Sequence, residues 1–332
     1  MAKLDLDLTA FYLEHARTKI NKLASKLKKS PQRVKYTLKL LNKEILVHPH
    51  CIFDYSYFGL ILFRVYFKGG YISEQDKLKI LEQLRENQYI VSMYELSGEF
   101  DLVIELIAPN PSRVNKELKN LSELIPTLKH YKLILNIVTH LYPKTYLFQH
   151  PEHFPELEKQ LIIGGDRSPL AFTNHELLIM KSLLEAPKIR LTALASRSGM
   201  NIKTAALILK SLQSRRIIKG FKYTINRDKL NIEKVRLFLN IHNTSKEREE
   251  ELMDFFLNTK EAIQVNKTVG DWDMEVDLES LDKTRIKLII NQLRERFKDL
   301  IENFNRAEFD EYYKKSYLPK HVFNPDLKSL LV

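Results

Sequence analysis

The pattern of apolar and polar positions divides the chain into two copies of one unit. Leu-Ala-Ser occurs at 23–25 and again at 194–196, and the stretch "SGEFDLVIEL" at 97–106 has a counterpart, "VGDWDMEVDL", at 269–278. Both matches occur in the same order and at nearly the same offset, 171 residues for the first and 172 for the second. Two weak matches in almost one register indicate a tandem duplication.

Each unit opens with three short helical segments. In the first unit Ser30 and Pro31 suit the N-cap and the first position of the third helix. The apolar stripe of this helix is Val34, Leu38 and Leu41. The stripe leaves the polar side chains facing outward, as in the recognition helix of a helix-turn-helix. The alternative is that three short helices pack only as a bundle, which would leave the segregated charge described below unexplained.

The turn before the third helix differs between the units. In the second unit Gly199 suits a left-handed stop after the second helix, whereas the first unit has Lys28 and Lys29 there. We therefore expect in the first unit either a different turn or one strained by about 1 kcal/mol. The second unit also begins with a capping box made by Thr173 and Glu176.

The helical part of each unit is followed by elements in the order β-α-β-β-α-β. For the first unit we predict strands at 60–67, 90–96, 101–107 and 130–142, and helices at 73–87 and 112–125. The Gly-acidic-aromatic-Asp motif falls at the hairpin between the second and third strands, where Gly supplies a positive φ. The preceding stretch "ILVHPHCIFDYSYFGL" predicts a short wing or a connecting strand.

These patterns predict an α+β protein of two tandem units, each a winged helix-turn-helix followed by a βαββαβ ferredoxin-like domain, an α/β sandwich. The expected boundaries are 1–50 and 172–226 for the helix-turn-helix domains, 51–147 and 227–320 for the ferredoxin-like domains, 148–171 for a linker and 321–332 for a C-terminal tail. The linker is rich in Pro and Gly, with one short predicted helix near "PELEKQLI".

The exposed faces of the two predicted sheets differ. Strands of the first unit are apolar on both sides, so that the face without helices should be covered by another sheet. Glu275 and Asp277 give the second unit a cleaner alternation and predict a wetter face. Pairing of the two units within one chain is the simplest cover, and pairing between chains is the alternative.

Positive charge is concentrated in two windows. Residues 17–43 carry ten Lys or Arg, residues 186–222 carry nine, and neither window contains an acid, in a chain of net charge +11. Such windows are typical of a polyanion-binding surface, with two solvated basic faces as the plainer alternative. The single cysteine, Cys51, and the lack of an apolar run of about 18 residues predict a cytoplasmic protein without a membrane span.

A set of residues spread over both units carries a family resemblance. They are Ala16 and Arg17, Leu-Ala-Ser at 23–25 and 194–196, Ser30, Val34, Leu38, Leu41, "SGEFDLV" and "VGDWDME". In their order and spacing the chain resembles the Lrp/AsnC family of bacterial and archaeal transcription regulators. The resemblance implies DNA binding by the helix-turn-helix, an intrachain pseudo-dimer of the ferredoxin-like (RAM) domains, further homo-oligomerisation, and sensing of an amino acid or other small effector.

The resemblance and the charge pattern together predict two sets of site residues. Those expected to contact double-stranded DNA are Lys19, Lys28, Lys29, Ser30, Gln32, Arg33, Lys35, Tyr36, Lys39, Lys203, Thr204 and Lys210. Those expected near an effector are Gly98, Asp101, Gly270 and Asp273, unless each Asp only caps its own turn. Base reading is expected mainly from Gln32, Arg33 and Tyr36, because the third helix of the second unit, "NIKTAALILK", is apolar on nearly every side.

An enzymatic branch also resembles this family. Siroheme decarboxylases of alternative haem synthesis have the same two-part unit, sometimes fused in tandem, and carry His and Arg around the second and third strands to hold tetrapyrrole carboxylates. The segments "VSMYELSGEFDLVIEL" and "QVNKTVGDWDMEVDL" contain neither residue type. His48, His50 and Cys51 could be imagined as metal ligands, but strand packing is favoured because no fourth ligand is indicated.

We therefore predict a DNA-binding transcription regulator that is not an enzyme, with no catalytic residues, no metal and no cofactor. Two alternatives stay open at this point. One is a siroheme decarboxylase-like tandem enzyme, and the other is a ligand sensor that has lost DNA binding.

Overall fold

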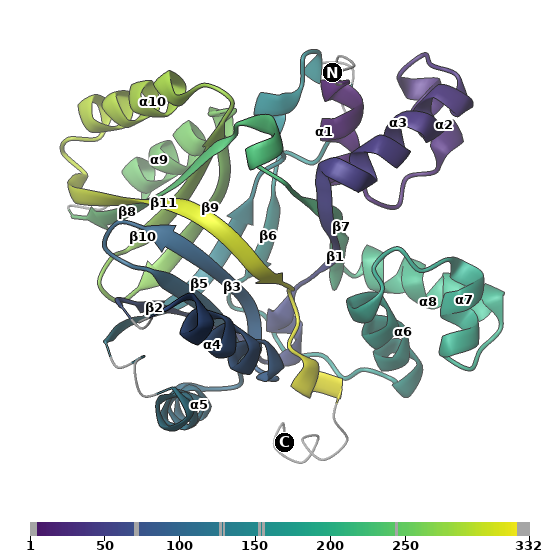
Figure 1. The fold of residues 1–332 in the computed structure, drawn as a ribbon, viewed down its shortest axis with the longest axis horizontal. Helices are drawn as coiled ribbons and strands as arrows, with labels where there is room; N and C mark the ends of the chain where they lie inside the picture. The colour runs from purple at the N-terminus through teal and green to yellow at the C-terminus, as the bar shows by residue number, and fades with distance from the viewer. Residues whose placement is uncertain are drawn as a thin grey trace.

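The computed structural model describes residues 5–69, 73–125, 128, 130–151, 154, 157–242 and 245–323. Two helical units lie on one side of a β-barrel, and further helices cover the outside of the barrel (Figure 1). The helices are α1 (Leu6–Glu14), α2 (Ile20–Lys26), α3 (Pro31–Glu44), α4 (Glu74–Glu86), α5 (Pro111–Leu124), α6 (Asn174–Glu185), α7 (Leu191–Arg197), α8 (Ile202–Ser214), α9 (Lys246–Asn258) and α10 (Lys283–Arg296).

The strands follow the predicted order in both units, which confirms the α+β fold class. They are β1 (Leu46–Phe53), β2 (Ile61–Phe67), β3 (Ile90–Ser97), β4 (Leu102–Ala108), β5 (Tyr131–Leu141), β6 (Leu161–Gly164), β7 (Ile218–Ile225), β8 (Glu233–Ile241), β9 (Ala262–Val269), β10 (Met274–Ser280) and β11 (Ile301–Lys315). The domain boundaries proposed above stay predictions, and residues 324–332 of the expected tail lie outside the described residues.

The two helix-turn-helix units use the same local signals. The Ser30 side chain caps α3 by accepting a hydrogen bond from the Arg33 amide at 3.3 Å, and Thr173 completes the predicted capping box on α6. The turn before the third helix is left-handed in both units, at Lys28 (φ 51°) and at Gly199 (φ 62°). The first unit therefore keeps the turn and bears the strain of a side chain there, about 1 kcal/mol.

The barrel is built from strands of both units. The strand order is β2-β4-β3-β11-β8-β10-β9-β5, and β5 pairs back onto β2 to close the sheet, with β6 added beside the end of β5. The pairings between β3 and β11 and between β5 and β9 each join one unit to the other. Closure leaves no open face between the ferredoxin-like domains, so the expectation that the two units cover each other within one chain is confirmed.

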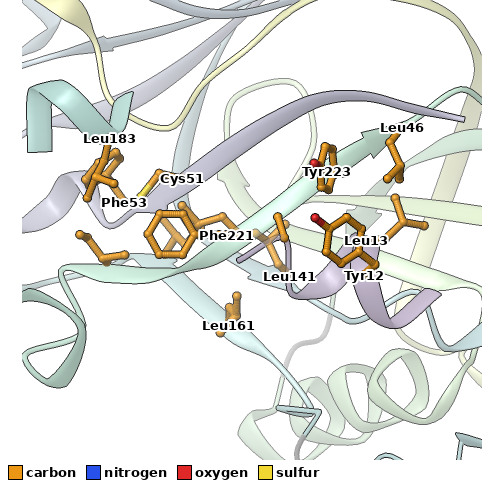
Figure 2. Close-up of a cluster of buried hydrophobic side chains, with 14 of the residues drawn as sticks. Tyr12, Leu13, Leu46, Cys51, Phe53, Leu141, Leu161, Leu183, Phe221 and Tyr223 are labelled. Atoms are coloured by element: carbon orange, nitrogen blue, oxygen red, sulfur yellow. The ribbon is translucent and has the colours of Figure 1, made fainter. Parts of the chain in front are cut away.

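A second junction joins the helix-turn-helix units. Strand β1 does not fold back as a wing of its own unit; it pairs antiparallel with β7, so that His50 lies opposite Lys222. Apolar side chains from both units and from the barrel gather along this ladder (Figure 2). The cluster includes Tyr12, Leu13, Leu46, Cys51, Phe53, Leu141, Leu161, Leu183, Phe221 and Tyr223. This core fixes the ladder against the end of the barrel.

Two sequence-based expectations about polar segments are wrong. Glu275 and Asp277 do not face water: both are at most 1% exposed and lie inside the barrel, because the face that alternation marks as polar is sealed by closure. The short helix expected near "PELEKQLI" is not formed by its described part, where Leu161 begins strand β6. Residues 155–156 of that stretch lie outside the described residues. None of the described helices is long and apolar enough to cross a membrane.

Candidate functional site

The interior of the barrel holds a buried network of charged and phenolic side chains. Arg236 makes a two-point ion pair with Asp277, at 2.6 and 2.9 Å, and donates to the hydroxyls of Tyr66 and Tyr94 at 2.7 and 2.5 Å. Tyr66 in turn donates to Glu275 at 2.6 Å. Each charge is therefore compensated in a place without water.

The counterpart of Arg236 in the first unit joins the same network. Arg64 donates to Glu105 at 2.9 Å and to Asn136 at 2.8 Å, and lies 3.1 Å from Glu275. Both arginines are 1% exposed. The network connects strands of both units, so it stabilises one particular closure of the barrel.

The network predicts loss of stability in acid. Burial raises the pKa of Glu105, but the positive charges of Lys315, Arg64 and Arg236 outweigh burial and lower the pKa from 4.5 to about 2. A carboxylate whose pKa is lower in the fold stabilises the protein above its unfolded pKa and loses this contribution as the pH falls towards the folded value. We expect the free energy of unfolding, measured by urea denaturation, to fall by on the order of 3 kcal/mol between pH 4.5 and 2 from Glu105 alone.

A Glu105→Gln variant provides the control for this acid loss. It should be destabilised at neutral pH and should have a shallower decline in acid than the unmodified chain. Equal slopes for the two proteins would contradict the role given to Glu105.

A cavity opens where the β1–β7 ladder meets the end of the barrel, and we call it cavity A. It has an empty volume of ≈ 680 Å³, which includes space open to solvent. Its charged lining side chains are five cations and two carboxylates, namely Lys144, Lys222, Arg227, Lys234, Lys315, Glu14 and Glu279. The excess of positive charge and the phenols that accompany it suit a ligand with several carboxylates.

Four of the five cations are held by protein groups. Lys144 pairs with Glu279 and Lys222 with Glu14. Lys234 lies 3.3 Å from Asp277 and donates to the Tyr312 hydroxyl at 2.8 Å, and Arg227 donates to the carbonyls of residues 309 and 310. These contacts fix the positions of the charges before any ligand arrives.

Lys315 differs from the other four. Within the part of the chain that the structure describes, its ammonium makes no hydrogen bond or ion pair with a protein group, and it lies near the rings of Tyr312 and Tyr317, 5.9 and 5.3 Å from their centroids. Burial lowers the pKa of Lys315, and the charges of Lys234 and Arg64 lower it further against the opposing effect of Glu105. A half-buried ammonium without a hydrogen bond or ion pair is well placed to bind an anion and to give up a proton.

His50 brings an uncharged ring to the same cavity. It projects from β1, is 8% exposed, and its ring lies 5.4 Å from that of Tyr317. Burial first, and then the charge of Lys315, lower the pKa of His50 from 6.5 to about 3. The imidazole is therefore neutral at neutral pH, and burial keeps the phenol of Tyr317 protonated by raising its pKa.

A smaller cavity adjoins cavity A, and we call it cavity B. It has an empty volume of ≈ 340 Å³ and shares Gln264, Lys315 and Tyr317 with cavity A. The rest of its lining is mostly apolar or already satisfied, with Leu62, Val91, Ile107, Thr139, Ile163, Tyr55, Arg64 and Glu105. Lys315 therefore stands between the two spaces.

The predicted DNA-contacting residues lie away from these cavities, on α3 and α8 and in the segments on either side of α2 (Figure 1). The side chains of the α3 face are exposed, with Tyr36 at 65%. They are Gln32, Arg33, Lys35, Tyr36 and Lys39. In the second unit Lys203 and Lys210 are exposed, and Leu207 between them is 69% exposed. Their assignment to DNA stays a prediction.

The predicted effector residues occupy two separate hairpins. Asp101 accepts a hydrogen bond from the amide of Gly69, and Asp273 accepts one from the amide of Ile241 at 2.8 Å. Gly98 (φ 130°) and Gly270 (φ 150°) approach the last strand of the opposite unit, and a Cβ at Gly270 would lie 2.7 Å from Ile134 Cδ1. These contacts make each motif a turn that permits closure of the barrel; an effector role for them stays a prediction.

Sequence reasoning missed most of the cavity. The sequence favours strand packing for His50 over a role as a metal ligand, whereas in the structure it lines cavity A together with the five cations. Among the described residues no group of three or more His, Cys, Asp or Glu side chains could hold a metal ion. One available signal was the charge at every second position of "KVRLF" and "MEVDLE", which in a strand directs several charges to one face.

Comparison with known proteins first gives the class of fold. The chain shares its full two-unit architecture with a solved enzyme, and the helix-turn-helix plus βαββαβ arrangement of each unit makes the fold Lrp/AsnC-like. No protein-family model matches the chain, and no curated protein matches it.

The solved enzyme is the siroheme decarboxylase NirDL. The chain matches its crystal structure at 15% identity with a TM-score of 0.58, over 98% of this chain and 99% of the other. A second NirDL structure, in complex with an iron-uroporphyrin III analogue, matches at 14% identity, a TM-score of 0.58 and the same coverage. An AsnC family transcriptional regulator from Agrobacterium tumefaciens matches 42% of this chain and 91% of its own at 14% identity, with a TM-score of 0.37.

These matches correct one prediction. The expectation that the chain is not an enzyme is contradicted, because both full-length matches are to an enzyme. That expectation rested on the lack of His and Arg in the second and third strands, which in the second unit contribute Ile263, Gln264 and Glu279 to cavity A. Cavity A takes its histidine, His50, from β1 and its arginine, Arg227, from the segment that follows β7.

Proposed function

We propose that this chain is a decarboxylase that acts on a tetrapyrrole with several carboxylates, siroheme being the first candidate. The single observation that carries the proposal is cavity A, where five cations meet a neutral histidine and protonated phenols at the junction of the two units. The full-length likeness to siroheme decarboxylase NirDL supports it through the shared fold.

The cations of cavity A would bind and orient the substrate. Lys222, Lys234 and Arg227 are fixed by protein contacts and present positive charge to carboxylates that are retained in the product. Bidentate or multiple charge-assisted hydrogen bonds fix a planar ligand more strongly than one contact does. The iron of siroheme would enter the cavity as part of the substrate, not as a metal ion held by the protein.

Lys315 would bind the carboxylate that is lost and supply the proton that replaces it. Decarboxylation breaks the bond between the carboxyl carbon and its neighbour, releases carbon dioxide and leaves an electron pair on that neighbour, which must take up one proton. The ammonium of Lys315 has such a proton, and its lowered pKa makes it a stronger acid than an exposed lysine.

Incubation with siroheme tests the proposal. We expect the purified chain to convert siroheme to products that are lighter by the mass of carbon dioxide, observed by mass spectrometry. Heat-denatured protein is the control. Siroheme recovered unchanged from native protein would contradict the proposed function.

Binding of double-stranded DNA is a second candidate function. The observation that favours it is the exposed, acid-free face of α3, which carries Arg33, Lys35, Tyr36 and Lys39 beside Gln32. Such a face suits the major groove, with Arg33 reading a base edge and the lysines contacting phosphates.

A gel-shift series tests this second function. We expect affinity for genomic DNA fragments to fall by about 10-fold or more between 50 and 200 mM salt, since phosphate contacts release counterions. Arg33→Ala should relax sequence preference, whereas Lys28→Ala should weaken binding to all sequences alike. An affinity that does not change with salt would rule out DNA binding by these faces.

A further inference from the structure

Several residues that line cavities A and B occupy equivalent positions of the two units. Residues of β8 and β10 lie 172 positions after their counterparts in β2 and β4, as Gly270 follows Gly98. In cavity A, Lys234 of β8 is paired in register with Glu279 of β10. The counterpart pair in cavity B is Leu62 of β2 with Ile107 of β4.

Further positions obey the same relation. Ile263 lines cavity A, and its counterpart Val91 lines cavity B, so that this wall is apolar in both copies. Arg227 lines cavity A, and its counterpart Tyr55 lines cavity B. The duplication has therefore kept the position of both sites, while the charges of Lys234, Glu279 and Arg227 are found in cavity A alone. The charged residues that line cavity B are Arg64, Glu105 and the shared Lys315.

The axis that relates the two copies passes through the β1–β7 ladder. His50 and Lys222 are 172 positions apart in sequence and also lie opposite each other in the ladder. Both line cavity A, one as a neutral ring and the other as a cation paired with Glu14. The two copies therefore differ even at the axis, where a symmetric homodimer would have two identical residues.

Strand β6, which lies between the two units in sequence, contributes to the wall of cavity B. Strand β6 pairs with the end of β5, and Ile163 from this strand lines cavity B. Gly164 packs so tightly that a Cβ there would lie 2.7 Å from the Tyr55 hydroxyl oxygen. In the described part of the chain no strand occupies the corresponding edge of β11, beside cavity A.

We infer that cavity A is the one functional ligand site of the duplicated pair, and that each chain binds a single polycarboxylate tetrapyrrole there. Lys234, whose counterpart is Leu62, is one of the residues that distinguish the copies. The ligand class rests on the proposed function, while the difference between the copies does not. Leu62 and Ile107 offer no partner to a carboxylate, and an unpaired carboxylate is costly to bury. Lys234 supplies a fixed ammonium at the equivalent place.

Titration of the full chain with iron uroporphyrin III, followed by absorbance, tests the inference. We expect one equivalent per chain at saturation. Lys234→Leu, which installs the residue of cavity B, should weaken binding about 10-fold or more. Lys234→Arg keeps the charge and should bind within about threefold of the unmodified chain. Leu62→Phe, which enlarges a wall of cavity B, should leave binding unchanged.

The outcomes separate the inference from the proposed function. Two equivalents per chain, or a loss on Leu62→Phe as large as that on Lys234→Leu, would overturn the single site even if decarboxylation is observed. No binding by the unmodified chain would overturn both. The Lys234→Leu chain should fold, because Arg236 still holds Asp277 by two contacts. Thermal melting checks that this variant is folded. If it is not, the number of equivalents bound by the unmodified chain and the affinity of Leu62→Phe still test the single site.

Discussion

Replacement of Lys315 by Met should lower the rate of siroheme decarboxylation by about 100-fold or more. The side chain is the one cavity cation without a hydrogen bond or ion pair to the described protein, and it lines both cavities. Its loss removes both an anchor for the departing carboxylate and the proposed source of the proton. A single-turnover assay separates the rate of the chemical step from binding.

Lys314 provides a matched control one position away. Its ammonium donates to the carbonyl of Arg85 at 3.0 Å, on the outer side of the barrel. Lys314→Met changes charge and length by the same amount as the Lys315 variant. It should keep the rate within about twofold, because Lys314 lines neither cavity. A rate for Lys315→Met equal to that of Lys314→Met would remove Lys315 from the chemistry.

The same assay has an expected pH dependence. Because the pKa of Lys315 is lowered by burial, the ammonium loses its proton at a lower pH than the ordinary value of 10.5. The rate of the chemical step should therefore begin to fall at a pH below 10.5 as the pH is raised. The pH–rate profile of the residual activity of Lys315→Met should not have this alkaline decline. The sign follows because the protonated form is the active one.

Replacement of Arg236 by Met should lower the free energy of unfolding by about 3–5 kcal/mol. The guanidinium is 1% exposed and satisfies Asp277, Tyr66 and Tyr94 at once. Its removal leaves the Asp277 carboxylate buried with Lys234 as its remaining cation, at 3.3 Å. Urea denaturation at neutral pH measures the change.

Arg306 is the control for a surface ion pair. It lies 3.8 Å from Glu308, and the two side chains are 56% and 51% exposed. Arg306→Met should cost less than about 0.5 kcal/mol. Losses of similar size for the two variants would show that the interior network does not stabilise the barrel.

Much of the fold could be predicted from the sequence, because its signals are local. The cap at Ser30, the capping box at Thr173 and the glycine turns at Gly98 and Gly270 each specify an element or its end. The repeat offset then places the same elements in the second unit. Local signals do not identify the partner of an edge strand. The pairings of β1 with β7, of β3 with β11 and of β5 with β9 therefore came only from the structure.

The site was harder to predict for a physical reason. Alternation along β10 identifies Glu275 and Asp277 as residues of one face, but it does not distinguish a solvated face from a sealed polar interior. The two basic windows, 17–43 and 186–222, predict a site on the helices. Of the five cations in cavity A only Lys222 falls inside one of these windows. Residues of a site assembled from both units share no local pattern.

A structure of the chain with iron uroporphyrin III bound is the most direct test of the claim that cavity A is the ligand site. We expect one tetrapyrrole per chain between the β1–β7 ladder and the end of the barrel, with carboxylate oxygens within hydrogen-bond distance of Lys234 and Lys315. Density for the ligand at the helix-turn-helix surfaces or at the Gly98 and Gly270 hairpins, with cavity A empty, would contradict it.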